Sequence, residues 1–582
     1  MAVTLSSLAG AGAQFFDNNG VPLAGGLIYT YLAGTSTPSA TYTSSTGLIA
    51  HANPIVLDAA GRIATGEVWL TSGVEYKFVV KTALFVQIGS YDNIPSINDF
   101  TSIYAALANT TSANLGDALI GFKQSNVSGL LSGAVGRTVH QKLQEFVSVL
   151  DFGAVADGVT DSIAAFQAAA LAAKCVYVPT GSYLISGTVS ISKNGAQWYG
   201  DGISSTIITS NSTTLPMFSI ATGLNGVQIE NLQLTRSVVA TNGADGIRCS
   251  TVTIGQAQLS RLLVQKQWVG INLGPTDYSE VKNCIVQKCL SEGFRVVNTA
   301  TDGACQWSFD SCLSQMNDAR GFLTQTIAGP AQVTLGTYKN CATYANSITG
   351  IAFAGSASVP IQGVRIIGGF YGESGNSNVY LDTYGDQHMI TAVFTELAGQ
   401  IATGSASSTP PSGIGSGIEV TSNNFGTLIT GCHSNGNSED GFYLSGVTTT
   451  INGCRATNNG LQLIVGKRNG VSNVGGTAII SGCRIGNTGS GTSQLYGISC
   501  VDGNNIAAVG NDLRSNTTAA FNATANATFL SKIANLPNTL DVQLSPAGAV
   551  VVNGTAVGGA SIVGGINVAA GLEKNNVAYT NP

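Results

Sequence analysis

A short pattern centred on cysteine recurs through the second half of the chain and limits the folds that it can adopt. The segments VKNCIVQKC, FDSCLSQMN, YKNCATYAN, ITGCHSNGN, INGCRATNN and ISGCRIGNT align on Cys284, Cys312, Cys341, Cys432, Cys454 and Cys483. A repeat of about 20–30 residues that contains several short strands is typical of a solenoid. We therefore expect a parallel β-helix, in which the aligned cysteines stack one above another inside the coil.

The long gap after Cys341 contains two further turns of the same pattern. IIGGFYGES places Gly369 in the cysteine column, and ITAVFTELA places Val393 there. A second column follows most of these segments, in DGIRC, VGINL, EGFRV, RGFLT, TGIAF, SGIEV, DGFYL and YGISC. Because a free thiol behaves as a small apolar group, the cysteine column fits a buried structural position better than a redox or metal site.

Composition excludes several classes of function. Charged residues make up 10% of the chain and the net charge is −6, with no Lys/Arg cluster, so no nucleic-acid partner is expected. There is no run of about 18 apolar residues to insert into a membrane, and MAVTLSSLAG does not resemble a secretory signal. The four histidines are scattered, and no cysteines show metal-ligand spacing, so we expect neither a metal nor a cofactor.

Changes in pattern divide the chain into four parts. Residues 1–95 show alternating apolar runs and predict a small antiparallel β-domain. Residues 96–148 predict a linker and neck, with a short amphipathic helix that carries Val139, Leu143 and Phe146. Residues 149–514 predict the β-helix. Residues 515–582 are nearly uncharged and strand-prone, and predict an oligomerisation region.

The segment VLDFGAVADGVTDSIAAFQAAALAA opens the third part and contains three aspartates. Asp151 and Asp157 stand in turn-forming sequence, where Asp and Gly are favoured. Asp161 precedes an alanine-rich helical run and is expected to cap it. We interpret all three as structural rather than catalytic.

Two stretches resemble a known family. VSVLDFGAVADGVTDSIAAFQAA and the following VYVPTGSYLI resemble the opening of the pectate-lyase-like right-handed β-helix superfamily. FFDNNGVPLAGGLIYTYLAGTSTPSATYTSSTG, with NPIVLDAAGRIATGEVWL and YKFVVK, resembles the N-terminal virion-attachment module of tailed-phage tailspikes. SGAVGRTVHQKLQEFVSVLDFGAV resembles the junction between them. The resemblance covers roughly residues 13–82 and 133–187 well.

This resemblance implies an all-β homotrimer. A right-handed parallel β-helix would lie between a small N-terminal antiparallel β-domain and a β-rich C-terminal trimerisation region. The N-terminal domain would bind a phage tail or baseplate protein, and the β-helix would bind, and usually cleave, a bacterial O-antigen or capsular polysaccharide. The protein would be assembled in the host cytoplasm, belong to the virion tail and act at the bacterial surface.

The repeat alignment supplies a candidate carboxylate pair for that cleavage. Glycoside hydrolysis uses two carboxylates roughly 5–9.5 Å apart, and adjacent β-helix turns lie about 4.8 Å apart. With Gly369 stacked on Val393, Glu373 and Glu396 fall at nearby columns of adjacent turns. Other turns carry uncharged or basic residues at these columns, so the coil does not require acids there. Asp382 and Asp386 lie between the two glutamates and complete the predicted catalytic set.

Side chains that can contact a sugar surround this set. Aromatic rings stack on sugar rings, and histidine offers hydrogen bonds; the predicted binding residues are Trp307, Tyr371, Tyr380, Tyr384 and His388. Two rival clusters are Asp302, Asp310, Asp318 and Arg320, and Glu439 with Asp440. A groove between subunits is a further alternative.

The predicted function is that of an endo-glycosidase that depolymerises a bacterial surface polysaccharide. A non-cleaving adhesin and a polysaccharide lyase are alternatives of different chemistry. A secreted cellular enzyme is disfavoured by the absence of a signal and by the attachment-like module. A G-x-S-x-G elbow is absent, as are the NTD, DD and GHG patterns of polygalacturonases.

Overall fold

The computed structural model describes residues 3–533 with short gaps, and small segments beyond. The gaps are residues 96–99, 127–128, 131, 250–253, 300, 328, 330–331, 401–414, 463–465, 490, 502 and 525–526. Beyond residue 533 it describes residues 535, 541–544, 550–553, 573–574 and 577–578. The chain divides into two compact units, Met1–Glu145 and Phe146–Pro582. Most of the predicted oligomerisation region, 515–582, lies outside the described residues.

The first unit begins with antiparallel β-structure, as predicted. One sheet has the strand order β3-β2-β5-β6, and β1 pairs with β4. The bounds are β1 Val3–Leu5, β2 Leu27–Leu32, β3 Ile55–Val56, β4 Trp69–Thr71, β5 Tyr76–Lys81 and β6 Gln87–Ile94. Alternation along β2 and β5 turns Ile28 and Phe78 inward, and both are fully buried.

The predicted neck contains short helices. Their bounds are α1 Phe100–Leu107, the 3₁₀ helix η1 Gly116–Leu119 and α2 Val139–Leu143. Thr138 caps α2 reciprocally with Gln141, so each side chain accepts a backbone N–H of the other residue. The predicted apolar face is present only in part: Val139 and Leu143 lie in α2, whereas Phe146 lies three residues beyond its end. Leu143 is 57% and Phe146 60% exposed.

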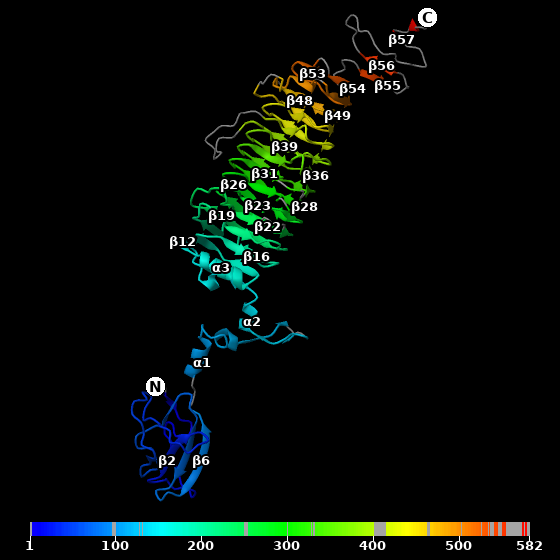
Figure 1. The fold of residues 1–582 in the computed structure, drawn as a ribbon. Coiled ribbons are helices and arrows are strands. Elements are labelled where there is room, and N and C mark those ends of the chain that lie inside the picture. The colour runs from blue at the N-terminus through cyan, green and yellow to red at the C-terminus, as the bar shows by residue number, and fades with distance from the viewer. Residues whose placement is uncertain are drawn as a thin grey trace. The chain divides into compact units, whose positions relative to one another are not determined.

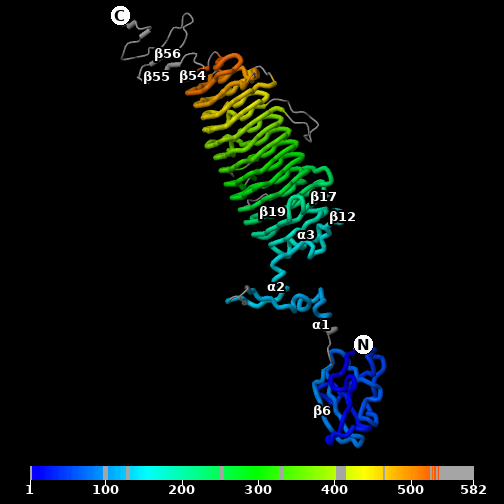
Figure 2. Tube along the Cα trace, turned by 180° about the vertical axis from the view of Figure 1, so that it is seen from behind, coloured from blue at the N-terminus to red at the C-terminus, as the bar shows by residue number. Residues whose placement is uncertain are grey.

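The second unit is the predicted parallel β-helix, with about thirteen stacked turns (Figures 1 and 2). One long sheet has 26 strands, with two strands from most turns, and a second sheet has 13. The second sheet consists of β15 Val189–Ile191, β18 Phe218–Ile220, β20 Ile247–Cys249, β23 Ile271–Gly274, β27 Phe294–Val297, β31 Arg320–Gln325, β35 Thr349–Ala354, β39 Val379–Asp382, β42 Ile418–Val420, β45 Phe442–Leu444, β48 Asn469–Asn473, β51 Tyr496–Cys500 and β53 Ala519–Ala523. A smaller sheet of five strands closes part of the coil.

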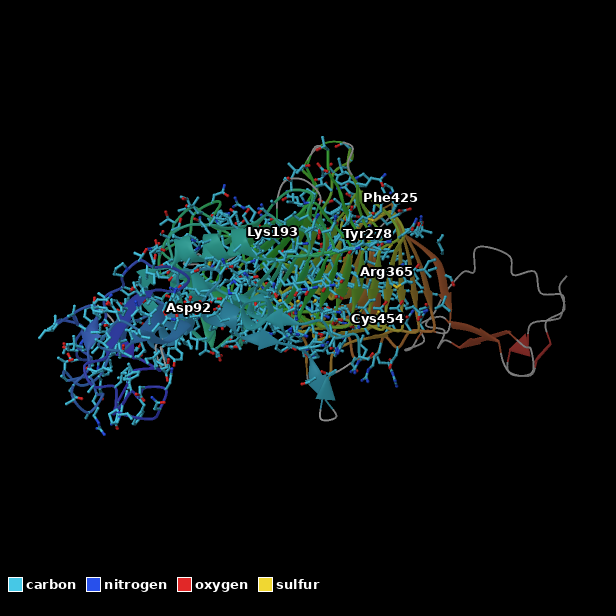
Figure 3. The ribbon with its side chains drawn as sticks, turned by 90° about the horizontal axis from the view of Figure 1, so that it is seen from below. Asp92, Lys193, Tyr278, Arg365, Phe425 and Cys454 are labelled. Carbon is cyan, nitrogen blue, oxygen red and sulfur yellow. The ribbon has the colours of Figure 1, made fainter. Side chains whose placement is uncertain are left out.

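The strand register confirms both predicted columns. The long sheet includes β37 Arg365–Ile367, β38 Phe370–Gly372, β40 Met389–Thr391, β41 Phe394–Glu396, β43 Thr427–Thr430, β44 His433–Asn435, β46 Thr448–Asn452 and β47 Arg455–Thr457. Phe370 pairs with Phe394, which sets Gly369 on Val393, and Phe394 pairs in turn with His433. In the second column, Val379 pairs with Ile418 and Ile418 with Phe442. Arg365 and Cys454, labelled in Figure 3, belong to the turns of the long sheet.

A tight bend separates the two halves of each turn in the long sheet. The residue before the column cysteine adopts a left-handed conformation, with φ of 52° at Asn283, 56° at Ser311 and 60° at Gly453. Glycine and asparagine tolerate this conformation better than other residues. This explains why Asn, Ser or Gly precedes each aligned cysteine. The cysteines themselves are buried and free, as the structural interpretation predicts.

The coil interior combines stacked apolar side chains with hydrogen-bonded amides. The rings of Phe294 and Phe322 stack 4.6 Å apart on successive turns. At an interior corner, Asn317 Nδ2 donates to Asn346 Oδ1 at 2.9 Å. Each buried aromatic side chain contributes about 1.5–3 kcal/mol through the hydrophobic effect. The amide ladder satisfies backbone groups that a corner would otherwise leave unpaired.

The aspartates that open the coil have structural partners. Ser148 N–H donates to Asp151 at 2.8 Å, and Asp157 accepts the N–H groups of Val159 and Thr160, also at 2.8 Å. Helix α3, Ile163–Ala172, begins one residue later than expected, with Ser162 at the N-cap. Asp161 still accepts the N–H of Ile163 at 3.1 Å.

The coil extends past residue 514, where the sequence predicted its end. Strand β53 continues the second sheet, and β54, Thr528–Ile533, pairs in parallel with β52, Asn505–Val509. The reason is that the nearly uncharged segment still alternates apolar and polar residues, as a further turn requires. Within the described residues, no helix is both long and apolar enough to span a membrane.

Candidate functional site

A groove of about 520 Å³ lies over the second sheet of the coil and the bends that lead into it. Polar side chains dominate its lining. The lining residues are Arg320, Ile348, Thr349, Asn376, Ser377, Tyr380, Gly415, Glu419, Glu439 and Lys467. A wide, polar groove of this kind suits an extended hydrophilic ligand better than a compact apolar one.

The strand order places these residues along the coil axis. Arg320 begins β31, Tyr380 lies in β39 and Glu419 in β42, while Glu439 and Lys467 stand shortly before β45 and β48. The five steps from β31 to β48 span about 24 Å at about 4.8 Å per turn. The groove therefore runs across neighbouring turns, in the direction in which a chain-like ligand can lie.

Two carboxylates on neighbouring turns face this groove. Glu439 is 7% exposed, whereas Glu419 is partly exposed and accepts a hydrogen bond from Ser377 Oγ at 2.6 Å. Burial raises the pKa of Glu439; the Lys467 ammonium opposes that shift, and the charge of Glu419 adds to it. The pair thus combines a carboxyl group biased towards its protonated form with a carboxylate held by a hydroxyl donor.

Two cations stand on either side of the pair along the axis. Lys467 Nζ lies 3.6 Å from Glu439 Oε2 and 3.7 Å from the ring centroid of Tyr443. Arg320 Nη1 lies 3.4 Å from Oε1 of Glu292 on the preceding turn. Both distances are long for charge-assisted hydrogen bonds, which are usually 2.7–2.9 Å. About a third of each cationic side chain is exposed.

Tyr380 contributes a phenol to the groove. It pairs across the sheet with Glu419. Burial, with the charges of Asp382 and Glu419, raises the pKa of Tyr380 to about 12. The phenol is therefore neutral near pH 7, and its O–H is a donor. Of the nine residues predicted for catalysis and sugar binding, Tyr380 alone lines this groove.

Asp440, beside Glu439, lies inside the coil. Its Oδ1 accepts the backbone N–H of Asn469 at 2.7 Å and the side-chain amide of Asn469 at 2.8 Å. Oδ2 has no hydrogen-bond partner among the described residues. Burial raises the pKa of Asp440 to about 7. Asp440 thereby fixes the start of β48, two residues after Lys467.

The predicted pair Glu373 and Glu396 lies on adjacent turns, as expected, but at a bend outside the groove. Glu373 N–H donates to the carbonyl of Glu396 at 3.0 Å. Glu373 adopts the left-handed conformation with φ of 53°, in a bend position that other turns fill with Lys288, Met316 or Ala345. Its carboxylate accepts a hydrogen bond from Tyr344, which raises the pKa of that phenol.

The predicted aspartates lie elsewhere on the same turn. Asp382 ends β39, and its Oδ1 accepts hydrogen bonds from Thr421 and Asn423, both at 2.8 Å. Asp386 lies in the loop after β39, where one carboxylate oxygen is buried without a partner among the described residues. The four predicted carboxylates therefore do not converge on one cavity. The charge of Asp382 contributes to the raised pKa of Tyr380 in the groove.

Three predicted sugar-binding residues are buried in the coil. Trp307 and Tyr371 are completely buried, and Trp307 Nε1 donates to Tyr338 Oη at 3.3 Å. His388 is 1% exposed and hydrogen-bonds Thr383 at 2.7 Å; burial lowers its pKa to about 4. None of these three side chains has a face open to a sugar, which contradicts their predicted role in glycan binding. Tyr384 is partly exposed outside the groove.

The members of the two rival clusters differ in whether they line the groove. Arg320 and Glu439 line the groove, whereas Asp302 and Asp310 do not. Asp310 pairs with Lys339 at 3.4 Å, and burial raises the pKa of Asp318. Sequence reasoning missed Glu419, Ser377 and Lys467. The second column carried part of that signal, because Glu419 lies within SGIEV and Glu439 directly precedes DGFYL of the next turn.

No group of three or more His, Cys, Asp or Glu side chains suited to a metal ion occurs in the described part of the chain.

Comparisons with known proteins match parts of this chain. A family model described as rhamnogalacturonase A/epimerase, pectate lyase-like, matches residues 146–241. The tail spike protein of Shigella phage Sf6 is 52% identical over 52 residues, which are 9% of this chain and 8% of that relative. The activity and partners of a whole tailspike are therefore proposals for this chain.

Two solved phage structures share the fold. Tailspike protein 3 of bacteriophage CBA120 aligns with a TM-score of 0.54 at 15% identity, over 84% of this chain and 74% of that one. An N-terminal fragment of gene product 12 of bacteriophage phi29 aligns with a TM-score of 0.52 at 16% identity, over 70% of this chain and 73% of the fragment. The tail spike segment, the pectate-lyase-like segment and the shared β-helix together confirm the predicted resemblance of this chain to the tailspike proteins of tailed bacteriophages.

Proposed function

We propose that this protein is a phage tailspike that binds a bacterial O-antigen or capsular polysaccharide and hydrolyses it in the groove, with Glu439 and Glu419 as the catalytic carboxylates. The observation that carries the proposal is one electrostatically coupled pair, on neighbouring turns, in a groove long enough for several sugar units. The predicted pair Glu373 and Glu396 has the same spacing in turns but lines no such groove.

The proposed roles follow from the two environments. Glu439, whose pKa is raised by burial, donates its proton to the glycosidic oxygen as the bond from that oxygen to the anomeric carbon breaks. Glu419, held by Ser377, acts on the anomeric carbon, either directly as nucleophile or by taking a proton from the attacking water. In the nucleophile route, water then breaks the bond between Glu419 and the anomeric carbon and gives its proton to Glu439. In the water route, Glu419 releases the proton to solvent and Glu439 takes one up again. In both routes water supplies the new hydroxyl group.

The remaining lining orients the polysaccharide. Tyr380 offers a neutral phenol that donates to a sugar hydroxyl or presents its ring edge beside Glu419. Asn376, Thr349 and Ser377 add hydrogen-bonding groups along the axis. The groove length of about 24 Å accommodates several sugar residues and favours cleavage within a chain over removal of end units.

The first unit is proposed to bind a phage tail or baseplate protein, and the chain to form a homotrimer. The similarity of 52 residues of the chain to a phage tail spike protein supports a role in the virion, and the resemblance of the first unit to a virion-attachment module motivates the first proposal. Exposed apolar residues of the neck, including Leu143 and Phe146, support self-association, because such side chains gain free energy when a second copy covers them. We propose assembly in the host cytoplasm and action at the bacterial surface.

Purified wild-type protein is incubated with capsular polysaccharide and lipopolysaccharide from a panel of bacterial strains, and reducing ends and absorbance near 235 nm are followed. Hydrolysis gives new reducing ends with no ultraviolet absorbance, whereas a lyase gives both. Binding without new ends identifies an adhesin. The Glu419→Gln/Glu439→Gln double variant serves as control for contaminating enzymes, and equal activity in that variant contradicts the site assignment.

A further inference from the structure

The charges of the groove indicate which kind of polysaccharide it takes. Lys467 and Arg320 lie on opposite sides of the carboxylate pair along the coil axis. The lining therefore alternates cation, carboxylate pair and cation over several turns. A neutral glycan needs no such flanking cations, since hydroxyl groups are satisfied by neutral donors and acceptors.

Neither cation uses all of its N–H donors in the contact with its carboxylate partner. An ammonium has three N–H donors and a guanidinium has five. Among the described residues, the only carboxylate within ion-pair distance is Glu439 for Lys467, at 3.6 Å, and Glu292 for Arg320, at 3.4 Å. Glu292 also accepts Ser291 Oγ at 2.7 Å, so Arg320 shares it. Each cation retains N–H groups and exposed surface for a ligand.

The proposed role of Glu439 leaves the charge of Lys467 less well compensated. When Glu439 holds the proton that it donates, it carries no charge to balance Lys467. The ammonium then stands in a partly buried groove, where an unpaired charge is costly. A negative group on the substrate removes that cost.

We infer that the groove is built for an acidic polysaccharide, in which sugar carboxylates bind Lys467 on one side of the cleaved linkage and Arg320 on the other. This inference rests on the proposed function. A carboxylate fits both partners, since it accepts two parallel hydrogen bonds from a guanidinium and one or more from an ammonium. The uronic acids are the sugars that supply such a group.

Binding of the acidic sugar also prepares the proton donor. The sugar carboxylate competes with Glu439 for Lys467 and draws the ammonium away from it. Glu439 then loses the cation that favours its ionised form. The substrate thus favours the protonated state of Glu439 that bond cleavage requires, and a neutral glycan lacks this effect.

The test compares a native acidic polysaccharide with the same polymer after carboxyl reduction, which converts each carboxylate to a hydroxymethyl group. The polymer is one that the wild-type protein cleaves in the strain panel. We expect wild-type kcat/KM to fall about 10-fold or more on reduction, the range for losing one charge-assisted hydrogen bond. In Lys467→Gln, the preference for the native polymer should become smaller than in wild type, because only Arg320 still binds a sugar carboxylate.

Controls separate this inference from the proposed function. Lys288→Gln removes an exposed lysine outside the groove and should retain the wild-type preference. Arg320→Gln provides a second groove variant, and melting temperatures confirm folding of all three. If wild type cleaves native and reduced polymers equally, or cleaves only neutral polysaccharides, the inference is overturned and the hydrolase remains. If phosphorylated but not carboxylated polymers are preferred, the carboxylate assignment is overturned. If no polysaccharide is cleaved, the proposed function fails first.

Discussion

Two pairs of glutamates on neighbouring turns differ in one decisive respect. Glu373 and Glu396 sit where one half of a turn bends into the other sheet, and Glu373 occupies a backbone position that lysine, methionine or alanine fills elsewhere. Glu419 and Glu439 sit over the second sheet, in a groove with two cations and a phenol. Both pairs come from adjacent turns, so the separation in turns does not distinguish them.

The comparison shows that carboxylates on adjacent turns are common in this fold, whereas a pair that also shares a polar groove is rare. Glu439 is nearly buried beside a second carboxylate, which raises its pKa, while Glu373 bonds a tyrosine at a bend. Acid–base chemistry requires the two carboxyl groups to differ in protonation state near the working pH. In the groove, burial raises the pKa of Glu439, while Glu419 is partly exposed and accepts a hydrogen bond from Ser377.

The largest expected effect is on catalysis. Glu439→Gln and Glu419→Gln should each lower kcat on a cleaved polysaccharide by about 10²–10⁴-fold, because each removes one half of the acid–base pair. The control is Glu373→Gln/Glu396→Gln, which should remain within about twofold of wild type. The measurement is initial release of reducing ends. Loss of activity in the control with full activity in the groove variants would reverse the comparison.

The next effect concerns stability. The folded-state pKa of Asp440, about 7, lies above its unfolded value near 3.8, so the folded protein holds this proton more tightly. The free energy of unfolding should therefore fall as pH rises from about 4 to 7, by up to about 4 kcal/mol from this group. Asp440→Asn should flatten that dependence. Melting temperatures at pH 5 and pH 8 check it, and an unchanged slope in the variant contradicts it.

A smaller effect concerns pH dependence. Cleavage should decline as pH rises through the raised pKa of Glu439, because the donor must be protonated. Lys467 lowers that pKa, so Lys467→Gln should move the alkaline limb of kcat to higher pH. The kcat–pH profile of the variant is compared with that of Lys288→Gln. If the alkaline limb of the profile does not move, Lys467 does not influence the pKa of the proton donor.

The smallest expected effect concerns Tyr380, which the sequence analysis predicted to bind sugar and which lines the groove. Tyr380→Phe removes one hydroxyl donor from the groove and should raise KM about 3–10-fold, the usual range for one hydrogen bond. Tyr384→Phe, outside the groove, should leave KM unchanged. The two variants differ from wild type by one oxygen each, so substrate titrations compare them directly. Equal effects would indicate that the ligand extends beyond the groove.

The sequence predicted correctly those features in which one residue type recurs at the same position of successive turns. The Asn, Ser or Gly before each column cysteine marks a left-handed bend, and the pairing of Phe370 with Phe394 follows from that register. The amide ladder of Asn317 and Asn346 belongs to the same periodic order. Repetition makes each of these visible several times in one chain.

The site was only partly predictable because the exposure of a given side chain to the groove does not follow the repeat. Tyr371 and Tyr380 look alike in sequence, yet Tyr371 points into the coil and Tyr380 into the groove. Glu419 was hidden in the column segment SGIEV, which reads as a core strand. Lys467 lies between Glu439 and β48 in sequence, with no motif around it.

The amino-acid sequence by itself determined the coil, its register, its buried thiols and the resemblance to phage tailspikes, because each depends on local patterns that repeat from turn to turn. Only the tertiary structure decided which carboxylates share a groove and which side chains remain open to a ligand. Those properties depend on how the bends between the sheets project, and they bring together residues as distant in sequence as Arg320 and Lys467.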